Sequence, residues 1–342
     1  MKAMVFYEHG GIEKLKYTQV EEPRPSAKEV KIKVRACGLN HLDIWVREGL
    51  RGPDIPMPHI LGSEVAGEIA ELGEGVEGLE RGERVLVAPG LSCRRCRHCL
   101  SGNDSLCKDF KIMGYQKQGG YAEFTLARAE DIIPVSQVLS FEEWAAVPLV
   151  FLTAWHMLVS RGGLGPGEDV LIHAAGSGVG SAAIQIASLC GARVITTVGS
   201  REKVEKARAL GAQEVINYSE EDFVDGVKRF TQGKGVELVF EHIGQETWEK
   251  SLACLSPGGR MVVCGATTGP LGTVNIPYLF LRQLSIHGCY MGSRRELMDV
   301  LGLMEQGRLK PVVDSVFPLK DAPLAQKKME GRKFFGKIVL RP

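Results

Sequence analysis

Four cysteines lie close together in the first third of the chain, at a spacing suited to binding a metal. They are Cys93, Cys96, Cys99 and Cys107. Four thiolates on one short loop complete the tetrahedral ligand set of zinc, which leaves no open position for a substrate. The spacing therefore predicts a structural zinc. Composition alone leaves an iron–sulfur cluster open, whereas four unrelated surface thiols are disfavoured because exposed free cysteines are reactive.

A second chemical motif is a turn of small residues between an apolar strand and a helix. Residues 167–211 predict strands at 170–172 and 193–198 and a helix at 181–190. Small residues let the backbone approach a pyrophosphate, and the N–H groups at the start of the helix meet its negative charge. The turn departs from the strict G-x-G-x-x-G pattern, so a tight packing turn is the alternative, but its βαβ setting favours a dinucleotide. The predicted binding residues are Ala175, Gly176, Ser177, Gly178, Val179 and Gly180.

The end of the next strand bears on which dinucleotide binds. Sites that select NAD usually place an acidic residue on the ribose about 20 residues after the turn, and residues 197–199 contain none. Ser200, Arg201 and Lys203 follow, and two cations with a hydroxyl suit a 2′-phosphate. The segment favours NADP(H) over NAD(H), although both cations are also compatible with a solvated start of a helix.

The elements that position these motifs divide into a β-rich part and an α/β part. Residues 1–140 predict strands at 30–36, 65–76 and 84–88. Residues 141–158 predict one or two helices, for which Ser140 and Glu143 form a capping box. Beyond them, strands alternate with helices, and this alternation predicts a doubly wound parallel sheet. These later strands are expected at 214–217, 236–241, 259–264 and 284–289.

A helix from Arg294 and a final strand at 336–342 are expected to return to the β-rich part. The predicted architecture is a discontinuous catalytic domain, residues 1–149 and 290–342, with the zinc lobe at about 90–110. It surrounds a Rossmann domain at residues 150–289. The active site is expected in the cleft between the domains, at the carboxyl ends of the parallel strands.

Composition narrows the class of protein. The chain has 342 residues, of which 44% are apolar, and a net charge of +1. So small a net charge gives no electrostatic attraction to nucleic acid or to an anionic membrane. No apolar run approaches the ~18 residues of a membrane helix, and the charged N-terminus differs from a signal peptide. The odd total of nine cysteines argues against a disulfide framework. We therefore expect a cytoplasmic protein with a small-molecule substrate.

The motifs together resemble the medium-chain zinc-containing alcohol dehydrogenase superfamily, and most closely its quinone-oxidoreductase-like members. The resemblance covers nearly the whole chain, and it implies an α/β fold with a GroES-like catalytic domain and a Rossmann domain. It also implies a homodimer or homotetramer, for which the apolar stretch 276–281 beside the strand 284–289 is the expected contact. Besides the cysteine lobe, the markers are GLNHLD at 38–43, LGSEVAG at 61–67, AAGSGVG at 174–180 and FGKIVL at 335–340.

The chain departs from the zinc-using members of this superfamily at three positions. Their catalytic Cys, His and Cys correspond here to Asn40, Ser63 and Leu149. Zinc requires nitrogen, sulfur or carboxylate ligands, so the resemblance implies a structural zinc without a catalytic one. A rebuilt metal site stays open as an alternative, from the nearby residues Cys37, His41, His59 and Glu64.

The resemblance also implies roles for individual side chains. The Asn40 amide is expected to polarise a substrate carbonyl, and His41 or Asp43 to supply a proton. Thr153 is expected near the nicotinamide, and Lys337 is expected to contact the cofactor. The predicted function is hydride transfer between NAD(P)(H) and a quinone, enone or aldehyde. The alternatives are a zinc-dependent alcohol dehydrogenase with altered ligands and a non-catalytic nucleotide-binding protein.

Overall fold

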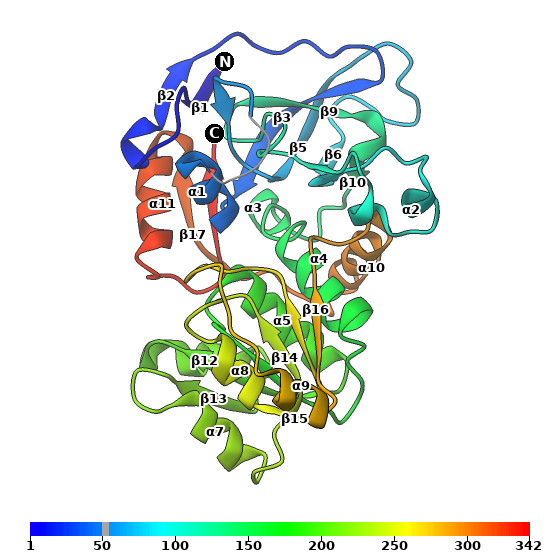
Figure 1. Ribbon diagram of the computed structural model, residues 1–342. Helices are drawn as coiled ribbons and strands as arrows, with labels where there is room; N and C mark the ends of the chain where they lie inside the picture. The colour runs from blue at the N-terminus through cyan, green and yellow to red at the C-terminus, as the bar shows by residue number, and fades with distance from the viewer. Residues whose placement is uncertain (50–54) are drawn as a thin grey trace. The chain divides into compact units, whose positions relative to one another are not determined.

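The computed structural model describes residues 1–49 and 55–342, and these residues form two compact units (Figure 1). No helix in this described part is both long and apolar enough to cross a membrane. Unit 1 comprises Met1–Leu149, Ser293–Met298 and Pro311–Pro342, and unit 2 comprises Val150–Gly292 and Asp299–Lys310.

Unit 1 is built on a largely antiparallel sheet of seven strands. The order is β10-β6-β5-β3-β18-β17, with β9 also paired to β3. Buried residues alternate along β3, as expected for a strand with one face on a core. The strands of this sheet are β3 (Glu29–Gly38), β5 (Glu64–Leu72), β6 (Arg84–Val87), β9 (Phe124–Arg128), β10 (Ile132–Pro134), β17 (Val313–Pro318) and β18 (Lys337–Arg341).

Smaller elements complete unit 1. A three-stranded sheet has the order β2-β1-β4, and β7 pairs with β8. These strands are β1 (Lys2–Phe6), β2 (Lys16–Gln19), β4 (His59–Ile60), β7 (Gly90–Leu91) and β8 (Lys111–Ile112). The helices are α1 (His41–Glu48), α2 (Arg97–Leu100), α3 (Phe141–Trp144) and α11 (Ala322–Glu330), and α10 (Arg294–Glu305) begins here.

Unit 2 is a parallel sheet of six strands in the order β13-β12-β11-β14-β15-β16, with helices packed alongside it (Figure 1). This is the strand order of the doubly wound dinucleotide-binding fold. The strands are β11 (Asp169–Ile172), β12 (Arg193–Val198), β13 (Glu214–Asn217), β14 (Val236–Glu241), β15 (Leu255–Val263) and β16 (Ser285–Gly288). The helices are α4 (Val150–Trp155), α5 (Gly178–Leu189), α6 (Val204–Ala209), α7 (Phe223–Phe230), α8 (Trp248–Ala253) and α9 (Ile276–Leu281).

The structure confirms the predicted sheet classes and the Ser140 capping box, and it corrects several boundaries. The stretch 141–158 is divided into α3 and α4, because Pro148 lacks the N–H that a continuous helix needs. Helix α5 begins at Gly178, three residues earlier than predicted, because the Ser177 hydroxyl caps it by accepting from the N–H of Gly180. Strand β15 begins at Leu255, and β17 and α11 were not predicted.

The C-terminal boundary also differs from the prediction that all of residues 290–342 belong to the first domain. Residues Asp299–Lys310 group with unit 2. The side chain of Gln185 in α5 accepts a hydrogen bond from the N–H of Lys310 and donates one to its carbonyl. These two bonds tie the end of the segment to the Rossmann helix, which accounts for the difference.

Candidate functional site

A buried ammonium group lies at the centre of the polar cluster of unit 1. Lys337 follows Gly336 at the start of β18, and its side chain is almost fully buried. Its Nζ donates to the carbonyl oxygen of Leu39 at 2.6 Å and to Oδ1 of Asn40 at 2.7 Å, and it lies 2.5 Å from Oε2 of Glu64. An ammonium has three N–H donors, so each of them has an acceptor inside the protein.

The Glu64 carboxylate is the negative partner of this cation. Its Oε2 also accepts from the Asn40 amide at 2.9 Å, and its Oε1 accepts from the backbone N–H of Leu149 at 2.7 Å. Both Glu64 and Lys337 are buried, where an ion pair is tolerated only if its remaining hydrogen-bonding capacity is satisfied. The cluster meets that condition.

Asn40 is held by both ends of its amide. Its Oδ1 accepts from Lys337, while its Nδ2 donates to Glu64 and, at 3.5 Å, to the Gly38 carbonyl. Asn40 is also the N-cap of α1. The structure therefore places Asn40 together with Lys337, and the amide orientation is fixed by charged neighbours rather than left to a substrate.

A second buried carboxylate belongs to Asp43, in the first turn of α1. It is fully buried and accepts from the N–H of Asn40 at 2.7 Å, the N–H of Gly62 at 3.2 Å and the hydroxyl of Tyr121 at 3.0 Å. Burial raises the pKa of Asp43 to about 6, against the opposing effect of these donors and of Lys337. Asp43 holds the Asn40 and Gly62 backbones in place; no exposed surface connects its carboxyl to solvent.

The two remaining residues predicted for catalysis, His41 and Thr153, belong to different units. His41 begins α1, half-buried, and its ring meets that of Trp45 edge-on at a centroid distance of 4.9 Å. Thr153 lies in α4 of unit 2 and is buried. Sequence reasoning missed Tyr121, because nothing in its local pattern connects it to an acid 78 positions earlier.

The positions that carry zinc ligands in the superfamily do not fit a metal here. Ser63 is buried, and its hydroxyl has no hydrogen-bond partner among the described residues. Leu149 offers only its backbone N–H, which Glu64 already accepts. An Asn amide and a Ser hydroxyl are poor ligands for zinc, and the charge facing Glu64 is an ammonium. The donor set suits Lys337 rather than zinc.

The four predicted zinc ligands, by contrast, converge. The Sγ atoms of Cys93, Cys96, Cys99 and Cys107 all lie within 4.8 Å of one another. The Sγ atoms of Cys93 and Cys99 are 3.9 Å apart, and those of Cys96 and Cys99 are 3.5 Å apart. A Zn–S bond of about 2.3 Å in a tetrahedron requires S–S distances of about 3.8 Å. In residues 1–49 and 55–342 this is the only group of three or more such ligands.

The cysteine lobe stabilises the thiolate form of Cys93, and ion pairs attach the lobe to the neighbouring segment. Backbone N–H groups of Arg95 and Cys96 point at the Cys93 sulfur and lower its pKa to about 6. The fully buried Asp131 pairs with Arg94 at 2.5 Å and with Arg128 at 2.6 Å. Because Arg94 lies between two of the cysteines, these bonds fix the lobe against the segment that precedes β10.

The predicted dinucleotide turn has the geometry of an anion site. The N–H groups of Gly178 and Val179, in the first turn of α5, have no intrahelical acceptor and are oriented to meet a phosphate. A Cβ at Gly180 would lie 2.3 Å from the Ala174 carbonyl oxygen, so the close approach of strand and helix requires glycine. The other turn residues are Ala175, which is buried, and Gly176 and Ser177, which are half-buried.

The residues predicted to read the ribose follow β12. Ser200 has a buried hydroxyl that finds no hydrogen-bond partner in the described part of the chain, and a ribose or phosphate oxygen would satisfy it. Arg201 is 85% exposed, and its Nε donates to Glu220 at 2.6 Å. Lys203 lies in the same short 3-10 helix. The structure thus brings these three residues to one corner of unit 2, together with an acid that sequence reasoning did not include.

The fold and the two sites together define a class: a two-unit oxidoreductase with a Rossmann domain for a nicotinamide dinucleotide and a GroES-like domain that carries a cysteine lobe. Two family models match, "Alcohol dehydrogenase GroES-like domain" over residues 26–137 and "Zinc-binding dehydrogenase" over residues 178–306. The chain belongs to the medium-chain zinc-containing alcohol dehydrogenase superfamily and is quinone-oxidoreductase-like. It is an NAD(P)-dependent oxidoreductase of that superfamily.

Individual relatives match over the full length. Quinone oxidoreductase 1 of Escherichia coli (strain K12) is 33% identical, over 98% of each chain. A 2-haloacrylate reductase of Burkholderia sp is 32% identical, over 99% of this chain and 98% of the relative. A crystal structure described as an NAD-dependent alcohol dehydrogenase is 46% identical with a TM-score of 0.96, over 100% of both chains. A quinone oxidoreductase of Escherichia coli complexed with NADPH is 31% identical with a TM-score of 0.86, over 100% of both chains.

We predict that Asp43 makes folding stability depend on acid pH. An unfolded Asp titrates near pH 3.9 and Asp43 at about 6, so the folded state binds the proton more tightly. This contribution to stability is complete below about pH 4 and is lost as the pH rises through about 6, by roughly 3 kcal/mol in all. The difference in unfolding free energy between the wild type and Asp43→Asn, measured in urea from pH 4 to pH 7, should shrink by that order.

The comparison isolates Asp43 because all other titrating groups are common to the two proteins. Tyr121→Phe is the matched variant, since it keeps the carboxyl and removes one donor to it. Losing that donor raises the pKa further, so the stability of this variant should fall by more in total, and up to a higher pH, than that of the wild type. Parallel pH profiles for the wild type and Asp43→Asn would contradict the assignment.

Proposed function

We propose that the protein is an NADP(H)-dependent reductase that transfers a hydride to a quinone or enone, or less efficiently an aldehyde, without a catalytic zinc. The observation that carries the proposal is the Lys337 ammonium, which pairs with Glu64 and the Asn40 amide. A Lewis acid must offer an open coordination position to the substrate. The N–H donors of Lys337 are all engaged, so this cation fixes the site electrostatically instead.

The substrate class follows from the charge that develops on oxygen. A bound nicotinamide supplies the hydride, and the protein supplies alignment and charge stabilisation. Reduction of a simple aldehyde leaves a localised alkoxide, whereas a quinone leaves a phenolate-like anion, whose parent phenol has a pKa of about 10. Delocalised anions need less external stabilisation. Relatives named quinone oxidoreductase and 2-haloacrylate reductase support acceptors of this kind.

The predicted side chains then divide by role. Asn40, fixed by Lys337 and Glu64, presents a defined dipole, and Asp43 holds its backbone. His41 at the start of α1 is the group proposed to relay a proton, since an imidazole titrates near neutral pH. Thr153 is proposed to pack near the nicotinamide. Lys337 is proposed to act through its charge, because a hydrogen bond to the cofactor would require it to give up one of its acceptors.

The cysteine lobe is proposed to hold one structural zinc per subunit. The sulfur separations match a tetrahedral site, and four thiolates leave no position for a substrate. A second candidate function is a zinc-dependent alcohol dehydrogenase with altered ligands. The 46% identical structure described as an alcohol dehydrogenase favours it, and metal content separates it from the first.

We predict one zinc per subunit in the purified protein, together with NADPH oxidation by quinones and enones at a kcat/KM about tenfold or more above that with simple aldehydes. Elemental analysis and a substrate panel on the same sample measure both. Cys96→Ser should remove the zinc and lower the melting temperature, because it deletes one of four ligands. Two zincs per subunit, the second lost in Glu64→Gln, would show that the Glu64 site binds a catalytic metal and that the zinc-free mechanism is wrong.

We predict that NADPH binds more tightly than NADH, and that Arg201 and Glu220 set the ratio. The 2′-phosphate must compete with Glu220 for the Arg201 guanidinium. Arg201→Ala should weaken NADPH binding by about tenfold, the scale of one hydrogen bond to a charged group, and leave NADH unchanged. Glu220→Gln should strengthen NADPH binding by freeing the guanidinium. Fluorescence titrations of the wild type and the two variants with each cofactor measure these affinities, and tighter NADH binding in the wild type would reverse the preference.

We propose a homodimer, or a tetramer of dimers, formed through the edge of the parallel sheet. Strand β16 is the last strand of that sheet, and an edge strand has unpaired backbone groups that favour pairing with a second copy. Helix α9, just before it in the chain, exposes Ile276, Phe280 and Leu281, each by more than 60%.

We predict that Leu281→Asp converts the dimer to a monomer, because it places a charge on the proposed apolar contact. Sedimentation velocity at micromolar concentration measures the change. Leu324→Asp, at another exposed leucine in α11 of unit 1, is the matched control and should remain dimeric. A monomeric wild type would refute the proposal.

A further inference from the structure

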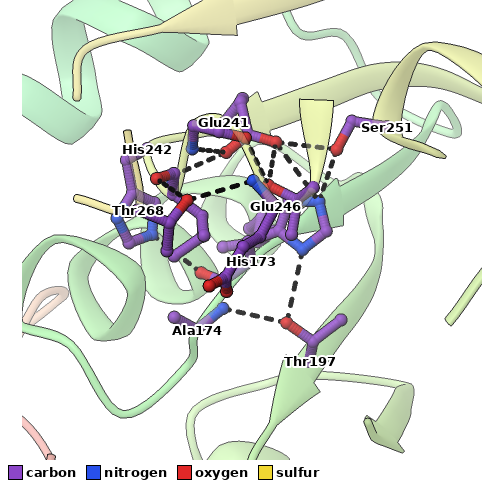
Figure 2. A network of polar contacts seen from close by, with 12 residues as sticks. His173, Ala174, Thr197, Glu241, His242, Glu246, Ser251 and Thr268 are labelled. Carbon is purple, nitrogen blue, oxygen red and sulfur yellow. Dashed lines mark hydrogen bonds and ion pairs between the residues drawn. The ribbon is translucent and has the colours of Figure 1, made fainter. Parts of the chain in front are cut away.

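A second buried polar network lies in unit 2, at the carboxyl ends of three neighbouring strands (Figure 2). His173 follows β11, Thr197 is in β12, and Glu241 ends β14. Strands β11 and β14 are adjacent although β12 and β13 come between them in sequence, so this is the point at which the strand order reverses. In open α/β sheets, the crevice outside such a point is where dinucleotides bind.

The hydrogen bonds of the network form a chain of donors and acceptors from Thr197 through His173 and Ser251 to Glu241. Thr197 Oγ1 accepts from the N–H of Ala174 at 3.0 Å and lies 3.4 Å from Nδ1 of His173. His173 Nε2 lies 2.8 Å from the Ser251 hydroxyl, which donates to Glu241 at 2.7 Å. Because Ser251 has a single proton, Nε2 must donate to it, and in the neutral ring Nδ1 then accepts from Thr197. Burial lowers the pKa of His173 to about 4, which keeps the ring neutral.

The chain of bonds ends on a carboxylate that holds a second turn. Glu241 Oε1 accepts from the N–H groups of Ile243 and Gly244, at 2.6 and 3.1 Å. Its Oε2 accepts from the hydroxyls of Thr247 and Ser251. Burial would raise the pKa of Glu241, but the hydrogen bonds from these donors hold it below its ordinary value. The carboxylate is thus charged and ties the loop after β14 to α8.

We infer that this network is a positioning device for the dinucleotide, in which His173 connects the turn 174–180 to the turn 241–247. Its first bond fixes Ala174, which adopts a left-handed conformation at φ 50°, a conformation that costs free energy in a residue other than glycine. That residue sets the entry to the anion-binding start of α5. The inference rests on the proposed function only for the identity of the ligand.

The resemblance of the network to a hydrolytic Ser-His-acid triad does not extend to chemistry. Ser251 is fully buried and His173 is 1% exposed. The hydroxyl donates its proton to Glu241 and accepts from the imidazole, which is the reverse of the direction that a nucleophilic serine requires. The network is therefore built to hold backbone in place.

The experiment compares two threonines that are neighbours in β12. Thr197→Val removes the acceptor of the Ala174 N–H. Thr196→Val removes a hydroxyl that is equally buried and donates to the backbone carbonyl of Ile172 at 2.6 Å rather than to a side chain of the network. We expect Thr197→Val to raise the Kd of NADPH about tenfold with a smaller effect on kcat at saturating cofactor, and Thr196→Val to leave the Kd within about twofold. Melting temperatures are measured on both to compare their stability losses.

A second set of variants tests the other end of the network, at Ser251 and His173. Ser251→Ala and His173→Leu each break the link to Glu241 and should weaken NADPH binding in the same way, whereas His173→Gln keeps an N–H donor and should recover part of the affinity. Equal Kd changes in Thr196→Val and Thr197→Val, or no recovery by glutamine relative to leucine, would overturn the inference.

A readout without cofactor separates this inference from the proposed function. Hydrogen exchange of the free protein should become faster in the turn 174–180 when Ser251 is changed to Ala, although Ser251 lies in α8, outside that turn. Unchanged exchange there would overturn the coupling even if NADPH binds. A wild type that binds neither NADPH nor NADH but shows the coupled exchange would refute the proposed function and the dinucleotide as ligand, while the link between the two turns would stand.

Discussion

The GroES-like unit depends on one buried ion pair, between the Lys337 ammonium and the Glu64 carboxylate. Removing either partner would leave an uncompensated buried charge. The polar groups around it, from Asn40, Leu39 and Leu149, already form hydrogen bonds with the pair. Breaking a buried pair in this way typically costs about 3–5 kcal/mol. The pair joins strands that are distant in sequence, β5 and β18, to the start of α1, so the last residues of the chain hold the geometry of the first motif. Folding stability therefore depends on this contact, and so would the chemistry proposed for Asn40.

The Rossmann unit satisfies a buried carboxylate in a different way. Within residues 1–49 and 55–342, no Lys or Arg pairs with Glu241; its carboxylate accepts from two N–H groups and two hydroxyls. A carboxylate stabilised by hydrogen-bond donors alone can stay charged without a cation. This matters at a switch point, because a buried lysine there would attract the pyrophosphate away from the start of α5. The arrangement leaves the positive end of the helix as the attractive feature of the turn.

Much of this organisation is readable from sequence, because it depends on local patterns. The parallel strands show as apolar runs, the cysteine lobe as a fixed spacing, and the capping box as Ser140 and Glu143. What sequence reasoning missed depends on contacts across long separations. It expected Lys337 to contact the cofactor but did not foresee its pairing with Glu64. It included Glu241 only as the end of a strand and gave His173 no role. A polar residue at the end of a buried strand was the available signal, since such a position must find partners.

The proposed zinc-free site differs in its chemistry from a site that holds a catalytic zinc. Zinc accepts an electron pair from the substrate oxygen and can lower the pKa of a bound hydroxyl. An ammonium whose three protons are engaged can do neither, and contributes a field that is fixed by covalent attachment to β18. The Glu64 carboxylate cancels much of this field, and what remains does not select the geometry of a developing negative charge. In the proposed mechanism, selectivity then depends on the acceptor itself. A conjugated acceptor delocalises the incoming electrons and therefore requires the least charge stabilisation from the protein.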